Sequence, residues 1–567
     1  MRCGAAQAQR GSRVITSTTT SGRRRALVAP RAWWLPRGGV ALAAAASLVF
    51  LVFVGGAGAA RAAGTGQGVR PPVQQPVTVH RHLASTVTNQ DWPAYLFSAR
   101  HPSVTTGPAT ITQGNAGTLR AAWMFQEQPP TGNQPPGGFS ASPTVSDGMV
   151  FIGSQTGDLY ALQESTGKVV WMRTLNYEQA GNNGNCKHAR GIVGTATVTT
   201  DPQTGKTIVY VPGARYLYAL DAATGAKEWK SLVGPANSAS VVGAYYNYAS
   251  PTVANGLVYE GVSSSCDHPF VRGGVQSFSQ QTGSLQHSFW TDPAGQVGAS
   301  VWSSEAATKG WVWVTTGDPE FTGTQLYHAY SFLRLNSSTL ALSGSWQLKL
   351  PQAADLDFGS SPTLFTGTVH GGSSPLVGAC NKNGRYYALQ RDSLSLGPVW
   401  SRRVGRPAHT HQGMCLASAV WNAQASTLYL AGNTRTISGH TYDGSVREVS
   451  ASTGTDKWAT GLGCGVLGTP ALDAATSVLA VATSGPCRNG SPAVYLLNAA
   501  TGHILGTLPL NAGAFAQPVF AGQYLLVADE SGQVVAYTPA AAAGHMRCTG
   551  WCSAWHRRIL PPPIPAP

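Results

Sequence analysis

One stretch of the sequence determines the predicted fold: Tyr160-Ala161-Leu162-Gln163-Glu164-Ser165-Thr166-Gly167-Lys168-Val169-Val170-Trp171. A second copy follows after roughly 57 residues and reads Tyr218-Ala219-Leu220-Asp221-Ala222-Ala223-Thr224-Gly225-Ala226-Lys227-Glu228-Trp229. In both copies a strand-like apolar triplet leads into a Thr-Gly turn, and a tryptophan follows four residues after the glycine. A fixed period in this range is typical of supersecondary units that are stacked or arranged around an axis.

The strand before the turn recurs eight times along the chain. The copies lie at 159–163, 217–221, 275–279, 332–336, 386–390, 446–450, 494–498 and 534–538. Other strand signals precede the copies: a small-residue motif such as Ala141-Ser142-Pro143-Thr144-Val145, and an alternating β-rich run such as 149–153. Each unit therefore reads as a four-stranded meander. The small-residue strand is expected to be innermost, because space near a central axis is limited.

The last unit lacks a fourth strand, and the N-terminal part of the chain supplies a spare one at 118–123. Pairing of this segment with 534–538 would close a ring and remove the free sheet edges. The sequence thus predicts an all-β protein: an eight-bladed β-propeller of four-stranded antiparallel blades over residues 89–539. A two-sheet sandwich array is the alternative.

Charge is distributed unevenly along the 567 residues, whose formal net charge is +14. Nine arginines and no acidic residue fall in 1–62, and three arginines fall in the tail from Ala540, which leaves +2 for the rest. A propeller so close to neutrality has no electrostatic footprint for nucleic acid. Charged residues make up only 11% of the chain, which favours an extracytoplasmic protein.

The N-terminal 62 residues have the pattern of an export signal. Arginines precede an uncharged apolar run at 40–60, and Ala60-Arg61-Ala62 fits a small-x-small cleavage site, so mature protein is expected to begin near Ala63. The run is also long enough to remain uncleaved as a membrane anchor. Residues 63–88 read as a flexible linker, and the Pro-rich tail 540–567 is expected to be disordered.

Eight cysteines remain after the signal, an even number that suggests disulfides in an oxidising compartment. Connectivity cannot be read from the sequence. Cys186 and Cys266 both follow outer-strand or second-strand segments into long loops expected near the axis, and they are the predicted pair.

The repeat, together with Asp91-Trp92-Pro93-Ala94-Tyr95 and the strand ending at Trp123, resembles the propeller proteins that bind pyrroloquinoline quinone, over residues 89–538. The pattern is most similar to the polyvinyl-alcohol-dehydrogenase-like branch. The resemblance implies a quinone lying near the propeller axis, a Ca²⁺ ion on its oxygen, and a carboxylate base that takes the proton of an alcohol.

The resemblance also implies individual roles. Arg190, in Ala189-Arg190-Gly191, is similar to the residue that holds a cofactor carboxylate, and Trp302 to the platform under the quinone. Lys382 is similar to the basic residue at the reactive quinone edge, and Arg272 belongs to a matching Arg-Gly-Gly motif. The catalytic base corresponds to Asp355. The expected metal ligands are Asp318, Asp267 and Asp357, with His268 standing where the family has a glutamate.

Each of these residues also has a structural interpretation. Trp302 is equally well explained as packing between blades, Arg190 and Lys382 as loop charges, and Asp355 and Asp357 as turn residues.

Three function classes follow. The first is a secreted quinoprotein that oxidises a small-molecule or polymeric alcohol and passes electrons to an unknown acceptor. The second is a cofactor-free extracytoplasmic binding or assembly scaffold, and the third is a quinone sensor without turnover. Contact with a membrane is expected only through the N-terminal anchor.

Overall fold

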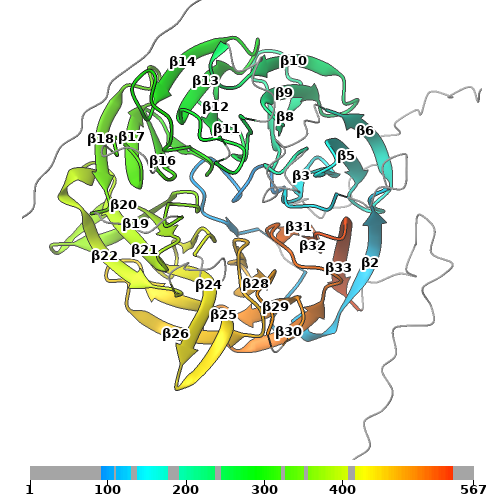
Figure 1. The fold of residues 1–567 in the computed structure, drawn as a ribbon. Coiled ribbons are helices and arrows are strands. Elements are labelled where there is room, and N and C mark those ends of the chain that lie inside the picture. The colour runs from blue at the N-terminus through cyan, green and yellow to red at the C-terminus, as the bar shows by residue number, and fades with distance from the viewer. Residues whose placement is uncertain are drawn as a thin grey trace, which may run out of the picture. The chain divides into compact units, whose positions relative to one another are not determined.

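The computed structural model describes residues 91–107, 110–128, 137–175, 191–236, 244–267, 269–320, 326–349, 355–406, 415–488 and 490–540. All of them belong to one compact unit, His82–Pro567. In this part of the chain eight sheets surround a common axis, as Figure 1 shows. The predicted eight-bladed β-propeller is confirmed.

The sheets follow one another in chain order, and we number the blades accordingly. Their strands are, in blade 1, β3 (Thr144–Ser146), β4 (Met149–Gly153), β5 (Asp158–Gln163) and β6 (Val169–Thr174); in blade 2, β7 (Thr197–Thr200), β8 (Thr207–Gly213), β9 (Tyr216–Asp221) and β10 (Lys227–Leu232); in blade 3, β11 (Thr252–Ala254), β12 (Leu257–Val262), β13 (Gly274–Ser279) and β14 (Leu285–Trp290); in blade 4, β15 (Ala306–Thr308), β16 (Trp311–Thr315), β17 (Ser331–Asn336) and β18 (Leu342–Gln347).

The second half of the ring repeats this order. Its strands are, in blade 5, β19 (Thr363–Val369), β20 (Gly372–Asn381), β21 (Arg385–Gln390) and β22 (Pro398–Arg403); in blade 6, β23 (Val420–Asn422), β24 (Thr427–Ile437), β25 (His440–Ser450) and β26 (Asp456–Leu462); in blade 7, β27 (Ala471–Asp473), β28 (Val478–Ala482), β29 (Ala493–Asn498) and β30 (Ile504–Pro509); in blade 8, β31 (Val519–Ala521), β32 (Tyr524–Ala528), β33 (Gln533–Pro539) and β2 (Leu119–Gln126).

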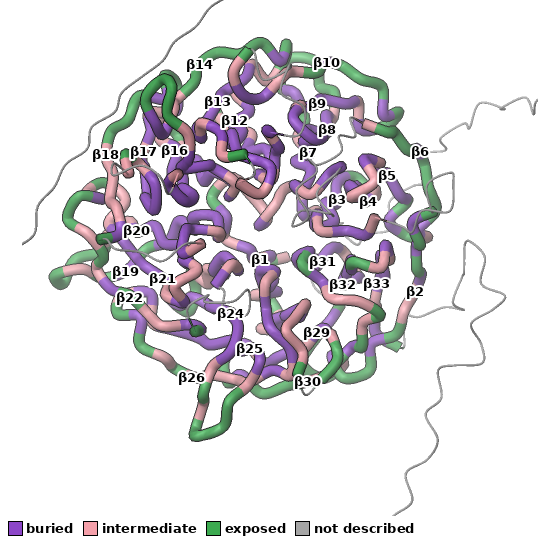
Figure 2. The backbone as a smooth tube through the Cα atoms, in the orientation of Figure 1, coloured by how far each residue is buried: buried purple, intermediate pink, exposed green. Residues whose placement is uncertain are grey.

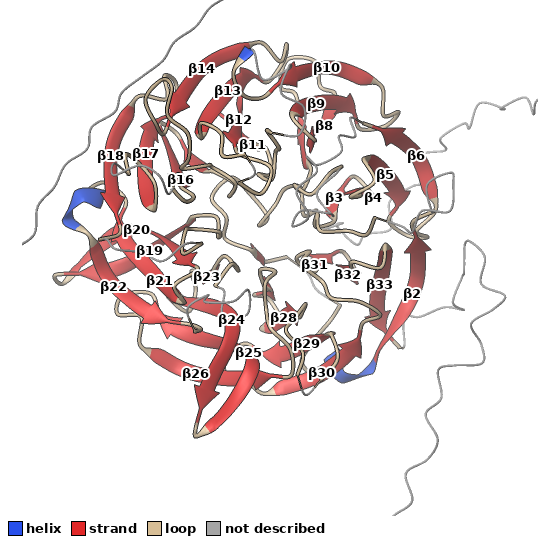
Figure 3. Cartoon of the chain, viewed as in Figure 1, coloured by secondary structure: helices blue, strands red, loops and turns tan. Residues whose placement is uncertain are grey.

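The described chain is almost entirely strand and turn, as Figure 3 shows. Short 3-10 helices interrupt it, among them η1 (Ala116–Thr118) and η3 (Leu394–Leu396). No helix in the described residues is long and apolar enough to cross a membrane. The central strands of each blade are mostly buried. The outermost strand of most blades consists largely of exposed and partly exposed residues, as Figure 2 shows.

The ring closes through the N-terminal strand β2. It pairs antiparallel with β33, and Trp123 lies opposite Ala536, as the sequence predicted. The Trp123 indole Nε1 donates a hydrogen bond of 2.7 Å to the carbonyl of Glu164 in the next blade. The same bond recurs from Trp171 to Ala222 at 2.9 Å and from Trp400 to Ala451 at 2.9 Å. The repeated tryptophan therefore docks blades 8, 1 and 5 onto the turn of the blade that follows each of them.

The Thr-Gly turn explains why a glycine follows the third strand. Gly225 has φ 68°, and a Cβ added there would lie 2.7 Å from the Trp171 ring. Both the left-handed backbone and the close approach of the indole require glycine.

Gly225→Ala is expected to destabilise the protein by about 1–3 kcal/mol more than Gly205→Ala, because only the first substitution forces a methyl group into a packed indole. Gly205 is the matched control, since it lies in the same blade with φ 67° but has nothing within 4 Å of an added Cβ. Urea unfolding of both variants measures the difference. Equal losses of stability would show that the turn conformation alone requires glycine.

The small-residue motif of the inner strands forms a ring of hydroxyl groups around the axis. A backbone N–H of one blade donates to a hydroxyl of the next: Ser142 to Thr195, Thr195 to Ser250, Ser250 to Ser304, Ser304 to Ser361, Ser361 to Ser418, and Ser418 to Thr469, at 2.8–3.0 Å. Gln517 N–H donates to Ser142 at 2.9 Å. The motif thus needs a hydroxyl as well as small size, which limited space alone did not predict.

Residues 91–107, here called the N-terminal segment, run along the inner strands of the ring. Backbone hydrogen bonds join it to blades 1, 2, 4, 5, 6 and 7, through Val145, Val198, Ala307, Leu364, Trp421 and Leu472. It adds β1 (Val104–Thr105) as a parallel fifth strand to blade 7, which the sequence did not predict. The Tyr95 phenol lies near the side chains of Thr469, Ser418 and Ser361 in the hydroxyl ring, and burial raises its pKa.

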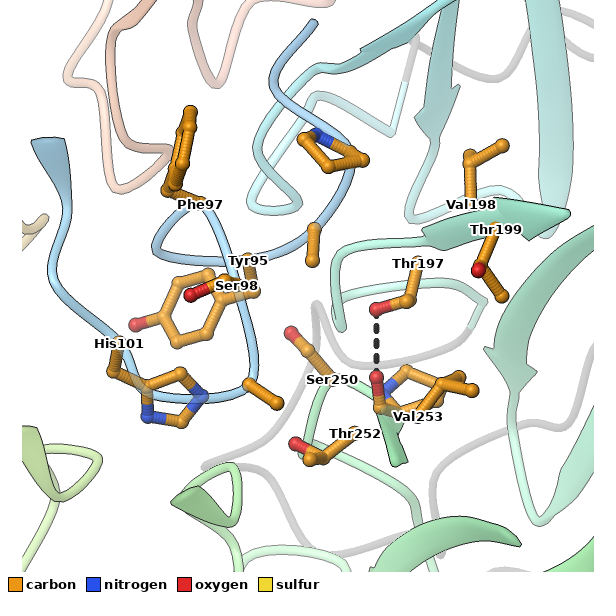
Figure 4. A pocket seen from close by; sticks show the side chains of 14 residues that line it. Tyr95, Phe97, Ser98, His101, Thr197, Val198, Thr199, Ser250, Thr252 and Val253 are labelled. Atoms are coloured by element: carbon orange, nitrogen blue, oxygen red, sulfur yellow. Dashed lines mark hydrogen bonds between the residues drawn. The ribbon is translucent and has the colours of Figure 1, made fainter. Parts of the chain in front are cut away.

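A cavity of about 180 Å³ remains between the N-terminal segment and blades 2 and 3, as Figure 4 shows. Tyr95, Phe97, Ser98 and His101 line one side of it, and residues of β7 and β11 line the other. None of the predicted site residues lines this cavity.

His101 makes the N-terminal segment sensitive to pH. It is 2% exposed, and its Nδ1 donates to the Pro362 carbonyl at 2.8 Å. Burial lowers the pKa of His101 to about 4, although the Pro362 carbonyl opposes the shift. Because the ordinary value is 6.5, the stability contributed by the neutral ring is complete above that pH. It is lost as the pH falls toward about 4, by on the order of 3 kcal/mol.

Urea unfolding of the wild type and of His101→Gln between these pH values tests this assignment. The stability advantage of the wild type is expected to shrink as the pH falls. An advantage that does not change with pH would mean that His101 does not titrate with unfolding.

Several predictions from the sequence fall outside the described residues. The signal or anchor at 1–62, the linker at 63–88 and the tail after residue 540 lie there, as do Arg190, His268 and Cys186.

Candidate functional site

Acidic residues gather at one end of the ring. Asp267 follows β12, Asp318 follows β16, and Asp355 and Asp357 precede β19. We call these four residues the acidic cluster. In antiparallel four-stranded blades, the turns between second and third strands lie at the same end as the connections between blades. The topology therefore brings these carboxylates together from three blades.

Backbone hydrogen bonds hold the loops of the cluster in place. Lys382, in the turn after β20, donates its N–H to the Asp357 carbonyl at 2.9 Å. Ala299 donates to the carbonyl of Asp318 at 2.5 Å, and Gly317 donates to that of Ser300 at 2.7 Å. The carboxylates thus project from a bonded framework.

Lys382 is the counter-charge of the cluster. Its Nζ forms ion pairs with Asp355 Oδ1 and, at 2.8 Å, with Asp357 Oδ1. Burial acts to lower the pKa of Lys382, but Asp357 and Asp355 overcome it and raise the pKa above its ordinary value. The lysine therefore stays charged. The Asp355 side chain is 46% exposed, while that of Asp357 is 4% exposed. Asp355 is the carboxylate of this pair that a substrate can reach.

Trp302 lies beside this ion-pair network. Its indole Nε1 donates to Asp357 Oδ2 at 2.7 Å, and Lys382 Nζ lies 4.9 Å from the centre of its ring. Gly359 allows the indole to pack, because a Cβ there would lie 2.4 Å from Trp302 Cη2. The ring remains partly exposed. The sequence analysis did not identify Gly359 as a site residue. Its position two residues after Asp357 could have indicated that it lies close to the site.

Asp318 is 5% exposed, and its Oδ1 has no hydrogen-bond partner among the described residues. Burial, and then the nearby Asp357 carboxylate, raise the pKa of Asp318 to about 9. Burial, and then the nearby Asp318 carboxylate, raise the pKa of Tyr330 above its ordinary value. Tyr330 was not predicted, since it lies in a segment without a recognisable motif.

Asp267 completes the cluster. It accepts a hydrogen bond from the Ser264 hydroxyl, and its backbone has φ 56°. Burial raises the pKa of Asp267, opposed by the Ser264 hydroxyl, and the charges of Asp357 and Lys382 also act on it. These interactions place Asp267 within electrostatic reach of the other carboxylates.

The cluster fits a hard cation. Carboxylate oxygens of Asp318, Asp355 and Asp357 all lie within 4.8 Å of one another. Oxygen ligands of this kind suit Ca²⁺, which accepts them in flexible geometry. The buried, unpartnered Oδ1 of Asp318 is an independent sign that an oxygen is available for a ligand.

The structure brings together six of the predicted site residues: Trp302, Lys382, Asp267, Asp318, Asp355 and Asp357. Arg272 is engaged elsewhere, since its Nε donates to the Asp292 carbonyl at 2.6 Å and its guanidinium covers the Trp290 ring at 4.9 Å. The individual roles of all these residues stay predictions.

Two disulfides lie among the described residues, and one of them is near the cluster. Cys380 bonds to Cys415, and Cys464 bonds to Cys487. Leu416, next to Cys415, would meet a Cβ at Gly359 and so packs beside the Trp302 site. Cys266 is also disulfide-bonded, but its predicted partner Cys186 lies outside the described residues, so that pairing stays a prediction. Cross-links of this kind restrict the unfolded chain and stabilise the loops they join.

Residues 92–398, more than half of the chain, match the family described as glucose/ethanol/alcohol dehydrogenase, β-propeller domain, abbreviated PQQ. The chain belongs to this family. Residues 442–546 match a second family, outer membrane protein assembly factor BamB. A search of curated proteins found no match.

Solved structures of several dehydrogenases share the fold of this family member. The quinohemoprotein alcohol dehydrogenase from Comamonas testosteroni has a TM-score of 0.62 at 17% identity, covering 81% of this chain and 82% of that chain. Quinohemoprotein alcohol dehydrogenase ADHIIG from Pseudomonas putida has a TM-score of 0.64 at 17% identity, covering 84% and 82%. A europium-containing methanol dehydrogenase has a TM-score of 0.62 at 16% identity, covering 77% and 89%.

Proposed function

We propose that the protein is an extracytoplasmic quinoprotein that oxidises an alcohol, with pyrroloquinoline quinone as cofactor and Ca²⁺ as its metal. The observation that carries this proposal is the arrangement of Lys382 between Asp355 and Asp357, beside the partly exposed Trp302 ring. Membership of the dehydrogenase propeller family supports it.

Each residue of the cluster has a task in this proposal. Trp302 offers a flat surface for the quinone, and Lys382 provides a positive charge at its edge. Asp318 and Asp357 would hold the cation, with Asp267 beside them. The quinone supplies an acceptor for the two electrons released when an alcohol becomes a carbonyl compound.

Asp355 is the proposed base. Its side chain is the exposed member of the pair around Lys382, so it is placed to take the hydroxyl proton of a substrate. Lys382 fixes the carboxylate by an ion pair. Asp357, which is 4% exposed and bonded to the Trp302 indole, is held away from the substrate. Exposure therefore distinguishes the base from its neighbour.

The wider setting of the reaction is also a proposal. The substrate is a small-molecule or polymeric alcohol, and the electrons pass to an acceptor of unknown identity. The apolar run at 40–60 and the disulfides favour a location outside the cytoplasm, secreted or anchored to the outer face of the membrane. No nucleic-acid partner is proposed.

A second candidate is a cofactor-free scaffold, which the match of residues 442–546 to an assembly-factor family favours. A scaffold gives no reason for the buried, unpartnered oxygen of Asp318.

Reconstitution separates the two candidates. Purified protein is mixed with pyrroloquinoline quinone and Ca²⁺, and unbound quinone is removed by gel filtration. A retained quinone absorption band, together with reduction of an artificial dye by primary, secondary or polymeric alcohols, supports the enzyme. A retained band without dye reduction supports the sensor, and absence of both supports the scaffold.

A further inference from the structure

Two arginines face each other at the end of blade 5 that carries the cluster. Arg385 is the first residue of β21 and Arg403 the last of β22, and the two lie directly opposite in the antiparallel register. Residues opposite each other in such a pair project from the same face of the sheet. Like charges in this position repel each other, so the pair needs a reason beyond packing.

The hydrogen bonds of both guanidinium groups go to neutral acceptors. Arg385 Nη1 donates to the Ser401 hydroxyl at 3.2 Å, and Arg403 Nη1 donates to the Gly405 carbonyl at 3.4 Å. Within the described part of the chain neither arginine forms an ion pair with an aspartate or glutamate. Both arginines thus lie on the same face of the blade and have no aspartate or glutamate partner among the described residues.

The pair is adjacent to the proposed active site. Arg385 directly follows the turn Lys382-Asn383-Gly384, and the N–H of Val404 donates to the Gly384 carbonyl at 2.8 Å. The Asn383 amide donates to the Tyr387 hydroxyl at 2.8 Å. Burial raises the pKa of Tyr387, while the hydrogen bond from Asn383 and the charges of both arginines oppose the rise.

We propose that Arg385 and Arg403 bind a carboxylate, and that this carboxylate belongs to the substrate, which is then a hydroxycarboxylate. The proposal rests on the proposed function. Guanidinium groups match the planar geometry of a carboxylate and can each donate two hydrogen bonds to it. A substrate bound there would have its carboxylate beside the turn that carries Lys382, the ion-pair partner of Asp355. A carboxylate of the cofactor has the same chemistry, so the test must separate the two sources.

The experiment compares the reconstituted wild type with Arg385→Gln/Arg403→Gln on straight-chain ω-hydroxycarboxylates and on the matching neutral diols. The double variant is expected to raise KM for hydroxycarboxylates by about ten- to a hundredfold, since each lost bond involves a charged donor. Its KM for diols and its affinity for the quinone are expected to be unchanged. Arg120→Gln is the matched control, because Arg120 is exposed on β2 and bonds to the neutral Leu119 carbonyl.

A second readout does not need turnover. Calorimetric titration of the quinone-free protein with an ω-hydroxycarboxylate is expected to show binding that the double variant loses and the control keeps. That result would support the anion site even if reconstituted protein oxidised no alcohol, so the two proposals fail separately. A fall in quinone affinity with unchanged KM values would assign the arginines to the cofactor and overturn the substrate assignment. Equal behaviour of wild type and double variant in all three assays would overturn the site itself.

Discussion

Asp355→Asn is expected to lower kcat for alcohol oxidation by about a hundred- to ten-thousandfold, the usual contribution of a positioned general base. The amide has nearly the shape of the carboxylate and can still accept a hydrogen bond from Lys382, but it cannot take a proton from the substrate. Quinone affinity is therefore expected to stay close to that of the wild type, because the Trp302 surface is untouched. Steady-state kinetics with an artificial dye, and quinone titration followed by absorption, measure the two effects.

Asp392→Asn is the matched control for this variant. Asp392 lies in the same blade, but its side chain is 65% exposed and pairs with Arg334 at 3.1 Å, away from the cluster. Its removal should leave kcat unchanged. An Asp355→Asn enzyme with wild-type kcat would assign the base to another residue. A variant that no longer binds quinone would show that Asp355 acts in binding.

Trp123→Ala is expected to lower the free energy of unfolding by about 3–5 kcal/mol, the range for truncating a buried tryptophan. Trp123 is 1% exposed, and its indole bonds to the Glu164 carbonyl in blade 1. The strand that carries it joins blade 8 to the N-terminal part of the chain. Its truncation therefore leaves a cavity and also removes the docking contact between the last blade and the first. Chemical denaturation followed by tryptophan fluorescence and circular dichroism measures the loss.

Two further variants show whether ring closure adds to this effect. Met124→Ala, at the next position and 37% exposed, is expected to change stability by no more than about 0.5 kcal/mol. Trp171→Ala removes the equivalent docking contact between blades 1 and 2, which no terminus is needed to form. A Trp123→Ala protein as stable as Met124→Ala would contradict a stabilising role for the closing contact.

The fold was predictable because its determinants repeat along the chain. One local contact between neighbouring blades requires Gly225 and Trp171. Because the same contact recurs around the ring, glycine and tryptophan recur at the matching positions of other copies. The N-terminal segment was not predictable in this way. Its bonds to the blades run mainly through backbone carbonyls, such as those of Pro93 and Ala99, and backbone groups leave no side-chain pattern.

The candidate site was predictable only in part. Resemblance to a family identified Trp302 and the four aspartates, which the fold indeed brings together. The ion pair of Lys382 with Asp357 was not foreseen, because it depends on a backbone bond between two loops that lie in different parts of the sequence. Arg272 shows the opposite case: its motif matches, but its guanidinium is held by the Asp292 carbonyl.

The N-terminal segment also bears on how the propeller unfolds. In a linear repeat protein each unit contacts only its neighbours, so the ends can fray while the middle stays folded. Here one short segment is bonded to the inner strands of six blades, from Val145 in blade 1 to Leu472 in blade 7. If any one of these blades unfolds, it releases part of the N-terminal segment, to which the other five blades are also bonded. The ring is therefore expected to melt as a single cooperative unit, with equal calorimetric and van't Hoff enthalpies.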